Sequence, residues 1–135
     1  MANHPYGANQ YKATAIKTAN RGQIVLMLYE GAIQNVKKAT VAIDKKDVAT
    51  KGVAIGKAHD IINELLNTLD KEVGGKVAED LERLYNFVIE QLIKANLENS
   101  KEPLIAVQKL LETLLDGWRV AVEQVNRGVA ALPSK

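Results

Sequence analysis

Residues 20–43 read NRGQIVLMLYEGAIQNVKKATVAI, and this stretch decides the fold class. Its apolar residues recur at steps of three or four: Val25, Leu28, Ala32, Val36, Ala39 and Ile43. That spacing places them on one face of a helix with 3.6 residues per turn. Asn20 is a favourable N-cap residue, and Gln23 stands three residues later, where its side chain can reach back to the cap. We therefore predict an amphipathic helix that begins at Asn20.

Three more segments repeat this pattern further along the chain. A second helix follows Asp47, which can cap it through its carboxylate. Gly74-Gly75 is the clearest chain break, because two residues without Cβ readily supply the left-handed geometry of a tight helix connection. Pro103 falls in the first turn of a fourth helix, where its missing N–H costs nothing. The three stripes are Val48, Ile55, Ala58, Ile62, Leu65 and Leu69; then Val77, Leu81, Leu84, Val88, Leu92 and Ala95; then Leu104, Val107, Leu111, Leu114, Trp118, Val122 and Val125.

Helices of similar length with short connections favour an all-α fold, an antiparallel up-down four-helix bundle. We place this bundle at residues 20–126. Residues 1–19 show no apolar periodicity before Ile16 and are predicted to form an N-terminal arm or a short extra helix. Residues 127–135 are predicted to be a flexible C-terminal tail.

Size and composition exclude several classes of protein. The chain has 135 residues, enough for one domain, and it has no cysteine, which excludes disulfides and thiolate metal sites. The longest uninterrupted apolar run, Ile24 to Tyr29, has six residues, against about 20 for a membrane span. This run is too short for membrane insertion, and the net charge of +2, with acids and lysines interspersed, predicts no nucleic-acid binding. A cytoplasmic protein without a secretion signal is expected.

The sequence offers few residues for catalysis or metal binding. The di-iron bundle pattern needs a Glu three residues before an inward-facing His, and Gly56 occupies that position relative to His59. We therefore predict no metal, no cofactor and no enzymatic activity. The alternative is a histidine phosphotransfer domain that uses His59, but the sequence after it, Asp60-Ile61-Ile62-Asn63-Glu64, places negative charge where a phosphoryl group would need positive charge.

A second apolar row accompanies each main stripe. Its members are Ile24, Met27 and Tyr29, then Ile61 and Leu66, then Tyr85 and Ile89, then Leu110 and Leu115. A bundle core needs about three apolar positions per heptad, and these segments exceed that number. The rows either widen the core, pack a short helix from the arm, or line grooves that suit an amphipathic partner segment. A purely structural, self-associating assembly protein is a further alternative.

These residues resemble those of a known family. Tyr11, Ile16, Thr18-Ala19-Asn20 and Leu26-Met27-Leu28-Tyr29-Glu30-Gly31-Ala32-Ile33 are similar to the opening of the flagellin-specific export chaperones of the FliS family. Further similar positions are Lys57-Ala58, Ile61-Ile62, Glu64-Leu65, Thr68-Leu69, Leu84-Tyr85, Leu92, Ala95-Asn96 and Trp118. The resemblance spans about Tyr11 to Val125. Arg21-Gly22 departs from the Pro-Glu or Pro-Gly of the family, and Leu115 stands where the family commonly has Arg.

The resemblance implies a cytoplasmic chaperone that binds the C-terminal segment of flagellin and prevents its premature polymerisation. Such a chaperone delivers flagellin to the flagellar type III export apparatus, which makes a component of the export gate a further expected partner. We predict client contacts at Leu28, Tyr29, Ile62, Leu65, Leu66, Leu69, Tyr85 and Leu92. Tyr11 and Ile16 are predicted to belong to an arm that covers part of the groove.

Overall fold

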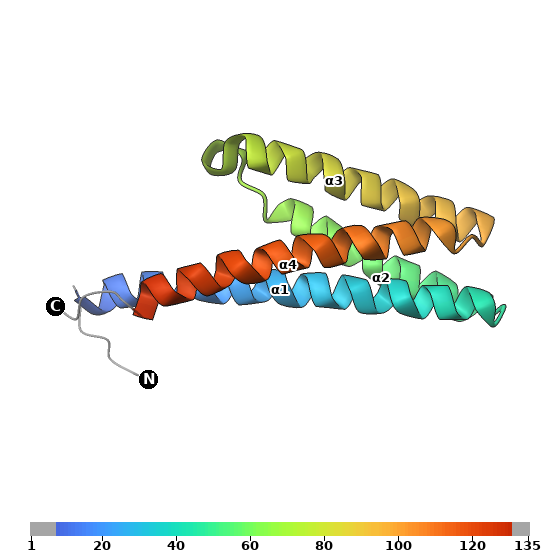
Figure 1. The fold of residues 1–135 in the computed structure, drawn as a ribbon, viewed down its shortest axis with the longest axis horizontal. Helices are drawn as coiled ribbons and strands as arrows, with labels where there is room; N and C mark the ends of the chain where they lie inside the picture. Colours follow the sequence, from blue (N-terminus) through green and yellow to red (C-terminus); the bar gives the residue numbers. More distant parts are fainter. Residues whose placement is uncertain (1–7, 131–135) are drawn as a thin grey trace.

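The computed structural model describes the backbone of residues 8–130 and the side chains of residues 21–128 (Figure 1). Its helices are α1 (Ala8–Asp44), α2 (Val48–Asn67), α3 (Lys71–Glu98) and α4 (Glu102–Ala130). Successive helices run in opposite directions, and residues 8–130 contain no strand. The predicted all-α, antiparallel four-helix bundle is therefore confirmed.

Each helix packs against two of the other three. α1 and α3 both contact α2 and α4, whereas the backbones of α1 and α3 do not meet anywhere in residues 8–130. α1 and α3 consequently occupy opposite corners of the bundle. In Figure 1 the first half of α3 diverges from α4, while the connected ends of these two helices lie together.

The hydrophobic core lies between the four predicted stripes. Its buried members are Tyr29, Ala32, Ile33, Val36, Ala39, Ala54, Ile55, Ala58, Ile62, Leu65, Tyr85, Val88, Leu92, Ala95, Leu104, Val107, Leu111 and Leu115. α3 contributes to this cluster only from Tyr85 onward. Val77, which the periodicity also assigns to a core-facing stripe, is 66% exposed. In the first half of α3 Ala78 is buried and Leu81 packs against the core, but the valines are exposed, so its apolar face is only partly covered.

Side-chain caps fix where the helices begin and end. Asp47 caps α2 by accepting a hydrogen bond from the backbone N–H of Thr50 at 3.1 Å, as predicted. Asp70 caps α3 in the same way, through the N–H groups of Glu72 and Val73. Asn99 ends α3 in the left-handed conformation that asparagine tolerates better than most residues. Pro103 is in the first turn of α4, which confirms its predicted position.

The predicted helix start at Asn20 is wrong. α1 begins at Ala8 and runs through Asn20 without interruption. Residues 8–19 contain no glycine or proline and four alanines, so their intrinsic preference allows the helix to extend past a residue that could have capped it. α4 likewise continues to Ala130, beyond the predicted start of the tail. The remainder of the predicted arm, residues 1–7, and of the tail, residues 131–135, lies outside the described residues.

The predicted break at Gly74-Gly75 lies inside α3. The connection from α2 is made by residues 68–70, and α3 has completed one turn before it kinks at Gly75. Gly75 has φ +53° and ψ −127°, a backbone conformation that residues with a Cβ rarely adopt. The glycine pair therefore sets the direction of α3 after the connection.

Replacing Gly75 with alanine is expected to lower the free energy of unfolding by about 1–3 kcal/mol, because alanine is strained at this backbone conformation. Gly117 provides the matched control. It lies within α4, and a Cβ there would meet nothing within 4 Å. Gly117→Ala is expected to raise stability by about 0.5–1 kcal/mol, since alanine is the better helix former. Urea unfolding followed by circular dichroism measures both, and equal effects would contradict this account of the kink.

Candidate partner-binding groove

An open groove lies where α3 diverges from α1 and α4. It has a volume of about 610 Å³ and is lined by α1, the α2–α3 connection, α3 and α4. Its apolar lining residues are Ile24, Val25, Leu69, Val73, Val77, Ala78, Leu81, Tyr85 and Trp118. Because these residues come from three helices and one connection, the groove depends on the tertiary fold and not on any single element.

Much of the groove's apolar surface is open to solvent. Val73 is 85% exposed and Val77 66%, both on the first half of α3, and Ile24 opposite them on α1 is 53% exposed. A valine or isoleucine in the core gains about 1.5–3 kcal/mol from burial. These three side chains forgo most of that gain in the isolated chain, which makes the groove a suitable surface for an apolar partner.

A second apolar cleft continues the groove between α1 and α4. It has a volume of about 220 Å³ and shares Arg21, Val25 and Trp118 with the first. Gly22 permits this close approach of the helices, since a Cβ there would lie 2.9 Å from a methyl carbon of Val122. We refer to the two together as the apolar groove. An open groove with this apolar lining suits an amphipathic segment of a partner protein.

A hydrogen-bonded aromatic cluster forms the floor of the groove. The hydroxyl groups of Tyr29 and Tyr85 are 2.5 Å apart, and the indole N–H of Trp118 donates to the Tyr29 hydroxyl at 3.1 Å. The Tyr29 ring centroid lies 6.2 Å from that of Tyr85 and 6.4 Å from that of Trp118, both at tilted angles that aromatic pairs favour. The cluster joins α1, α3 and α4 at the level where α3 begins to diverge.

Burial controls the protonation of both tyrosines. It raises the pKa of Tyr29 above the ordinary value of 10.0, although the hydrogen bonds that Tyr29 makes with Tyr85 and Trp118 act in the opposite direction. Burial also raises the pKa of Tyr85, and the proximity of Tyr29 adds to the increase. Both hydroxyls are therefore neutral at physiological pH, so the cluster positions helices and offers no ionised group for catalysis.

Comparisons with known proteins match the chain to one family. The family described as Flagellar protein FliS matches residues 2–125 of the chain. The chain belongs to the FliS family. It is 36% identical over 107 residues to the flagellar secretion chaperone FliS of Salmonella typhimurium, covering 78% of this chain and 79% of that protein. It is 29% identical over 124 residues to the Bacillus subtilis FliS, covering 92% and 90%.

A third relative, the flagellar secretion chaperone FliSB of Pseudomonas aeruginosa, is 34% identical over 113 residues and covers 81% of this chain and 90% of its own length. FliS proteins are chaperones and not enzymes, and a chaperone acts on another protein. The histidine phosphotransfer alternative is not supported by these relatives. In the structure His59 is half-buried on α2, and its Nδ1 pairs with the side-chain amide of Asn63 at 3.1 Å.

No set of three or more histidine, cysteine, aspartate or glutamate side chains in the described part of the chain is arranged to hold a metal ion. None of the helices in residues 8–130 has the length and hydrophobicity that a bilayer crossing requires.

The predicted contact residues divide into three groups. Five lie in the core with an exposed fraction of 1% or less: Tyr29, Ile62, Leu65, Tyr85 and Leu92. Leu28, Leu66 and Leu69 are half-buried and pack against the core. Tyr11 and Ile16 belong to α1, but their side chains lie outside the described residues. Of the ten, the structure places Leu69 and Tyr85 in the groove lining.

Sequence reasoning missed most of the groove. Val77, Leu81 and Trp118 were assigned to core-facing stripes, and Val73 was assigned to none. The position of Val73 could have indicated exposure, because this valine directly precedes the glycine pair Gly74-Gly75, where the chain was expected to change direction. The periodicity of α3 could not reveal that its first half lacks a partner on one side.

The aromatic cluster predicts an ordered series of stabilities. Tyr29→Phe removes the partner of both the Tyr85 hydroxyl and the Trp118 indole N–H, and is expected to cost about 1–3 kcal/mol of unfolding free energy. Tyr85→Phe leaves the Trp118 bond intact and is expected to cost about 0.5–1.5 kcal/mol. The double variant should cost less than the sum, since it removes one hydroxyl that Tyr29→Phe leaves unpaired. Strict additivity in urea unfolding would show that the hydroxyls are not coupled.

Alkaline pH is expected to destabilise the protein through the same two residues. An unfolded tyrosine loses its proton near pH 10, whereas the folded state holds the proton to higher pH because its pKa is raised. The free energy of unfolding should therefore fall as pH rises above about 10. The slope between pH 9 and 11 can be measured by urea unfolding, and it should be smaller in Tyr85→Phe. An unchanged slope in that variant would contradict the assignment.

Proposed function

We propose that this protein is a cytoplasmic flagellar secretion chaperone that binds the C-terminal segment of flagellin. Bound to the chaperone, flagellin cannot polymerise prematurely and is delivered to the flagellar type III export apparatus. The apolar groove is the observation that carries this proposal. Membership of the FliS family and the names of the relatives support the same class of function.

The energetics of ordering a flexible client favour a long groove over a small pocket. Each client residue that becomes ordered loses about 1–1.5 kcal/mol of conformational free energy. At about 25 cal/mol per Å², that loss is offset by roughly 40–60 Å² of newly buried apolar surface for each residue. Exposed aliphatic side chains on both walls of the groove, such as Ile24, Val73 and Val77, can supply such areas to an amphipathic segment.

We assign the direct contacts with flagellin to residues that line the groove. The predicted contact residues that are buried instead hold the helices around the groove in place. Leu69 and Tyr85 remain candidate contacts because both line the groove. Leu28 and Leu66 do not line the groove, but they are half-buried and remain candidate contacts. Ile62, Leu65 and Leu92 hold α2 and α3 in place beneath the surface, as does Tyr29 at the floor. Tyr11 and Ile16 remain proposed members of a covering segment.

Val77→Asp tests the groove directly. A carboxylate at this position would have to be desolvated when an apolar client side chain docks against it. Binding of a flagellin C-terminal fragment, measured by isothermal titration calorimetry, is expected to weaken about tenfold or more. The melting temperature should change little, because Val77 is 66% exposed and its burial contributes little to folding.

Val53→Asp is the matched control. Val53 is a valine of similar exposure, 59%, on α2 and outside the groove lining. Its replacement makes the same change of charge and should leave flagellin binding unchanged. The groove assignment fails if Val77→Asp binds as tightly as the parent chain, or if Val53→Asp weakens binding as much.

A further inference from the structure

A cluster of lysines lies at the end of the bundle opposite the groove (Figure 1). Residues 37–51 comprise the end of α1, the connection and the start of α2, and they contain five lysines and two aspartates. This stretch carries a net +3, whereas the whole chain carries +2. Residues 1–29 also carry a net +3, so this end of the bundle is distinguished by the arrangement of its lysines around two clefts.

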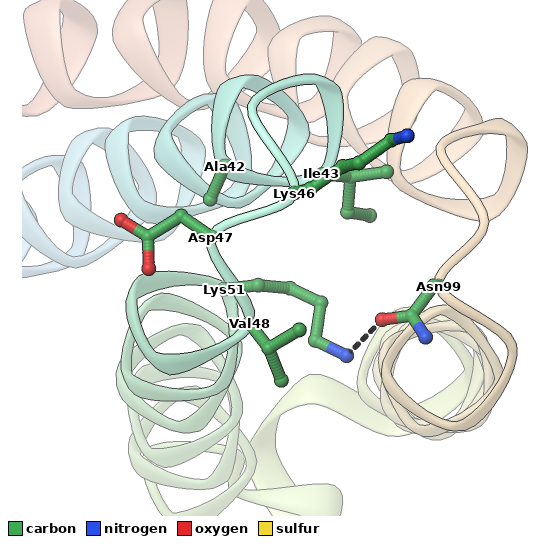
Figure 2. Close-up of a pocket in the computed structure, with 7 residues that line it drawn as sticks. All are labelled: Ala42, Ile43, Lys46, Asp47, Val48, Lys51 and Asn99. Carbon is green, nitrogen blue, oxygen red and sulfur yellow. Dashed lines mark hydrogen bonds between the residues drawn. The ribbon is translucent and has the colours of Figure 1, made fainter.

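Two adjoining clefts lie among these lysines. One, of about 340 Å³, lies between α1 and α2 and is lined by Lys37, Lys38 and Lys45 together with Val41. The other, of about 290 Å³, lies beneath the α1–α2 connection (Figure 2). Both clefts include Ala42 and Asp47, so they form one surface, which we call the basic end.

The basic end combines free positive charge with exposed aliphatic side chains. Lys38, Lys45 and Lys46 have no carboxylate within 4.0 Å among the described residues, and Lys37 approaches Glu112 only at 4.0 Å. Val41 is 51% exposed and Val48 63%. A ligand that fits this surface must therefore supply both negative charge and apolar groups.

Lys51 makes the basic end rigid on one side. Its side chain is 4% exposed, and its ammonium donates to the carbonyl oxygen of Asn96 at 2.9 Å and to the side-chain oxygen of Asn99. Figure 2 shows the side chain reaching from α2 to Asn99 at the end of α3. Both acceptors are neutral, so this buried cation has no counter-charge among the described residues and adds to the positive potential of the cleft.

We propose that the basic end is a second docking surface, and that it binds an acidic amphipathic helical segment of a partner protein. Carboxylates of the segment pair with Lys38 and Lys45, and its aliphatic side chains cover Val41 and Val48. The surface is separate from the apolar groove, so a partner can dock here while the groove is occupied. This proposal goes beyond the binding of flagellin and does not depend on it.

The chemistry of the surface favours a protein segment over nucleic acid or lipid. Asp47 lines both clefts and would repel a closely spaced row of phosphates, and nearby Asp44 pairs with Lys101 at 2.6 Å. The surface has no arginine and no aromatic residue in residues 37–51, whereas both are frequent in nucleic-acid sites. Spaced carboxylates on a helix can pair with the lysines and avoid the two aspartates.

A synthetic peptide tests the proposal with the full chain. The probe is a fluorescent, amidated helical peptide of about 15 residues with leucines along one face and glutamates beside them. Fluorescence anisotropy measures its affinity, which should weaken with added salt. The same peptide with glutamine for every glutamate should bind about tenfold more weakly, and so should the parent peptide to the chain carrying Lys38→Glu and Lys45→Glu.

Lys94→Glu with Lys109→Glu is the control. These exposed lysines lie on α3 and α4, and the pair makes the same change in net charge. It should alter affinity by less than about twofold if contacts, and not overall charge, decide binding. Circular dichroism melting confirms that both double variants fold.

Several outcomes would overturn the proposal. The first is equal weakening by the two double variants, or none by either. A second is tighter binding of a short DNA duplex or of phosphatidylglycerol vesicles than of the peptide, which would assign the surface to another class of partner. A third is displacement of the peptide by the flagellin C-terminal fragment, which would make the basic end part of the client site.

Discussion

The packing of α1 against both α2 and α4 is the constraint on which the rest of the structure depends. Small side chains at Ala32, Ala39 and Ala58 are fully buried, which lets the helices approach closely along most of their length. α3 has no backbone contact with α1 and contributes fully buried side chains to the core cluster only from Tyr85 onward. The first half of α3 therefore keeps its valines in solvent, and the apolar groove is the direct result of this incomplete packing.

The aromatic cluster marks the boundary between the closed and open parts of the bundle. Its hydrogen bonds connect α1 and α3 across the diagonal that their backbones do not bridge. Beyond the cluster, the Gly75 kink and the Asp70 cap hold the start of α3 at the rim of the groove. Polar bonds at the floor fix the spacing of the walls, so the groove can remain open without collapse of the helices onto each other.

The sequence predicted the features that depend on neighbouring residues. Helical periodicity located the four stripes, and Asp47 and Pro103 located helix starts, because capping and proline geometry act within one turn. The prediction at Asn20 was wrong because it considered only the turn that follows. A residue that can cap a helix does not do so when the residues before it are themselves helical. The groove was not predictable, because the exposure of Val77 depends on the direction of α3 relative to helices distant in the sequence. Five predicted contacts were core residues because groove and core rows have the same periodicity.

The two ends of the bundle differ in a way that makes their interactions separable. Ile24 and Val41 are 17 residues apart on α1, which is about 25 Å along a helix. The Debye length at physiological ionic strength is about 8 Å, so the lysines of the basic end exert little electrostatic influence on the groove. Docking at one end changes affinity at the other only if a single partner spans both or if the helices between them move. A closely packed core fills the bundle between Tyr29 and Ala39 and resists such movement, which leaves a client that spans both ends as the means of coupling the two surfaces.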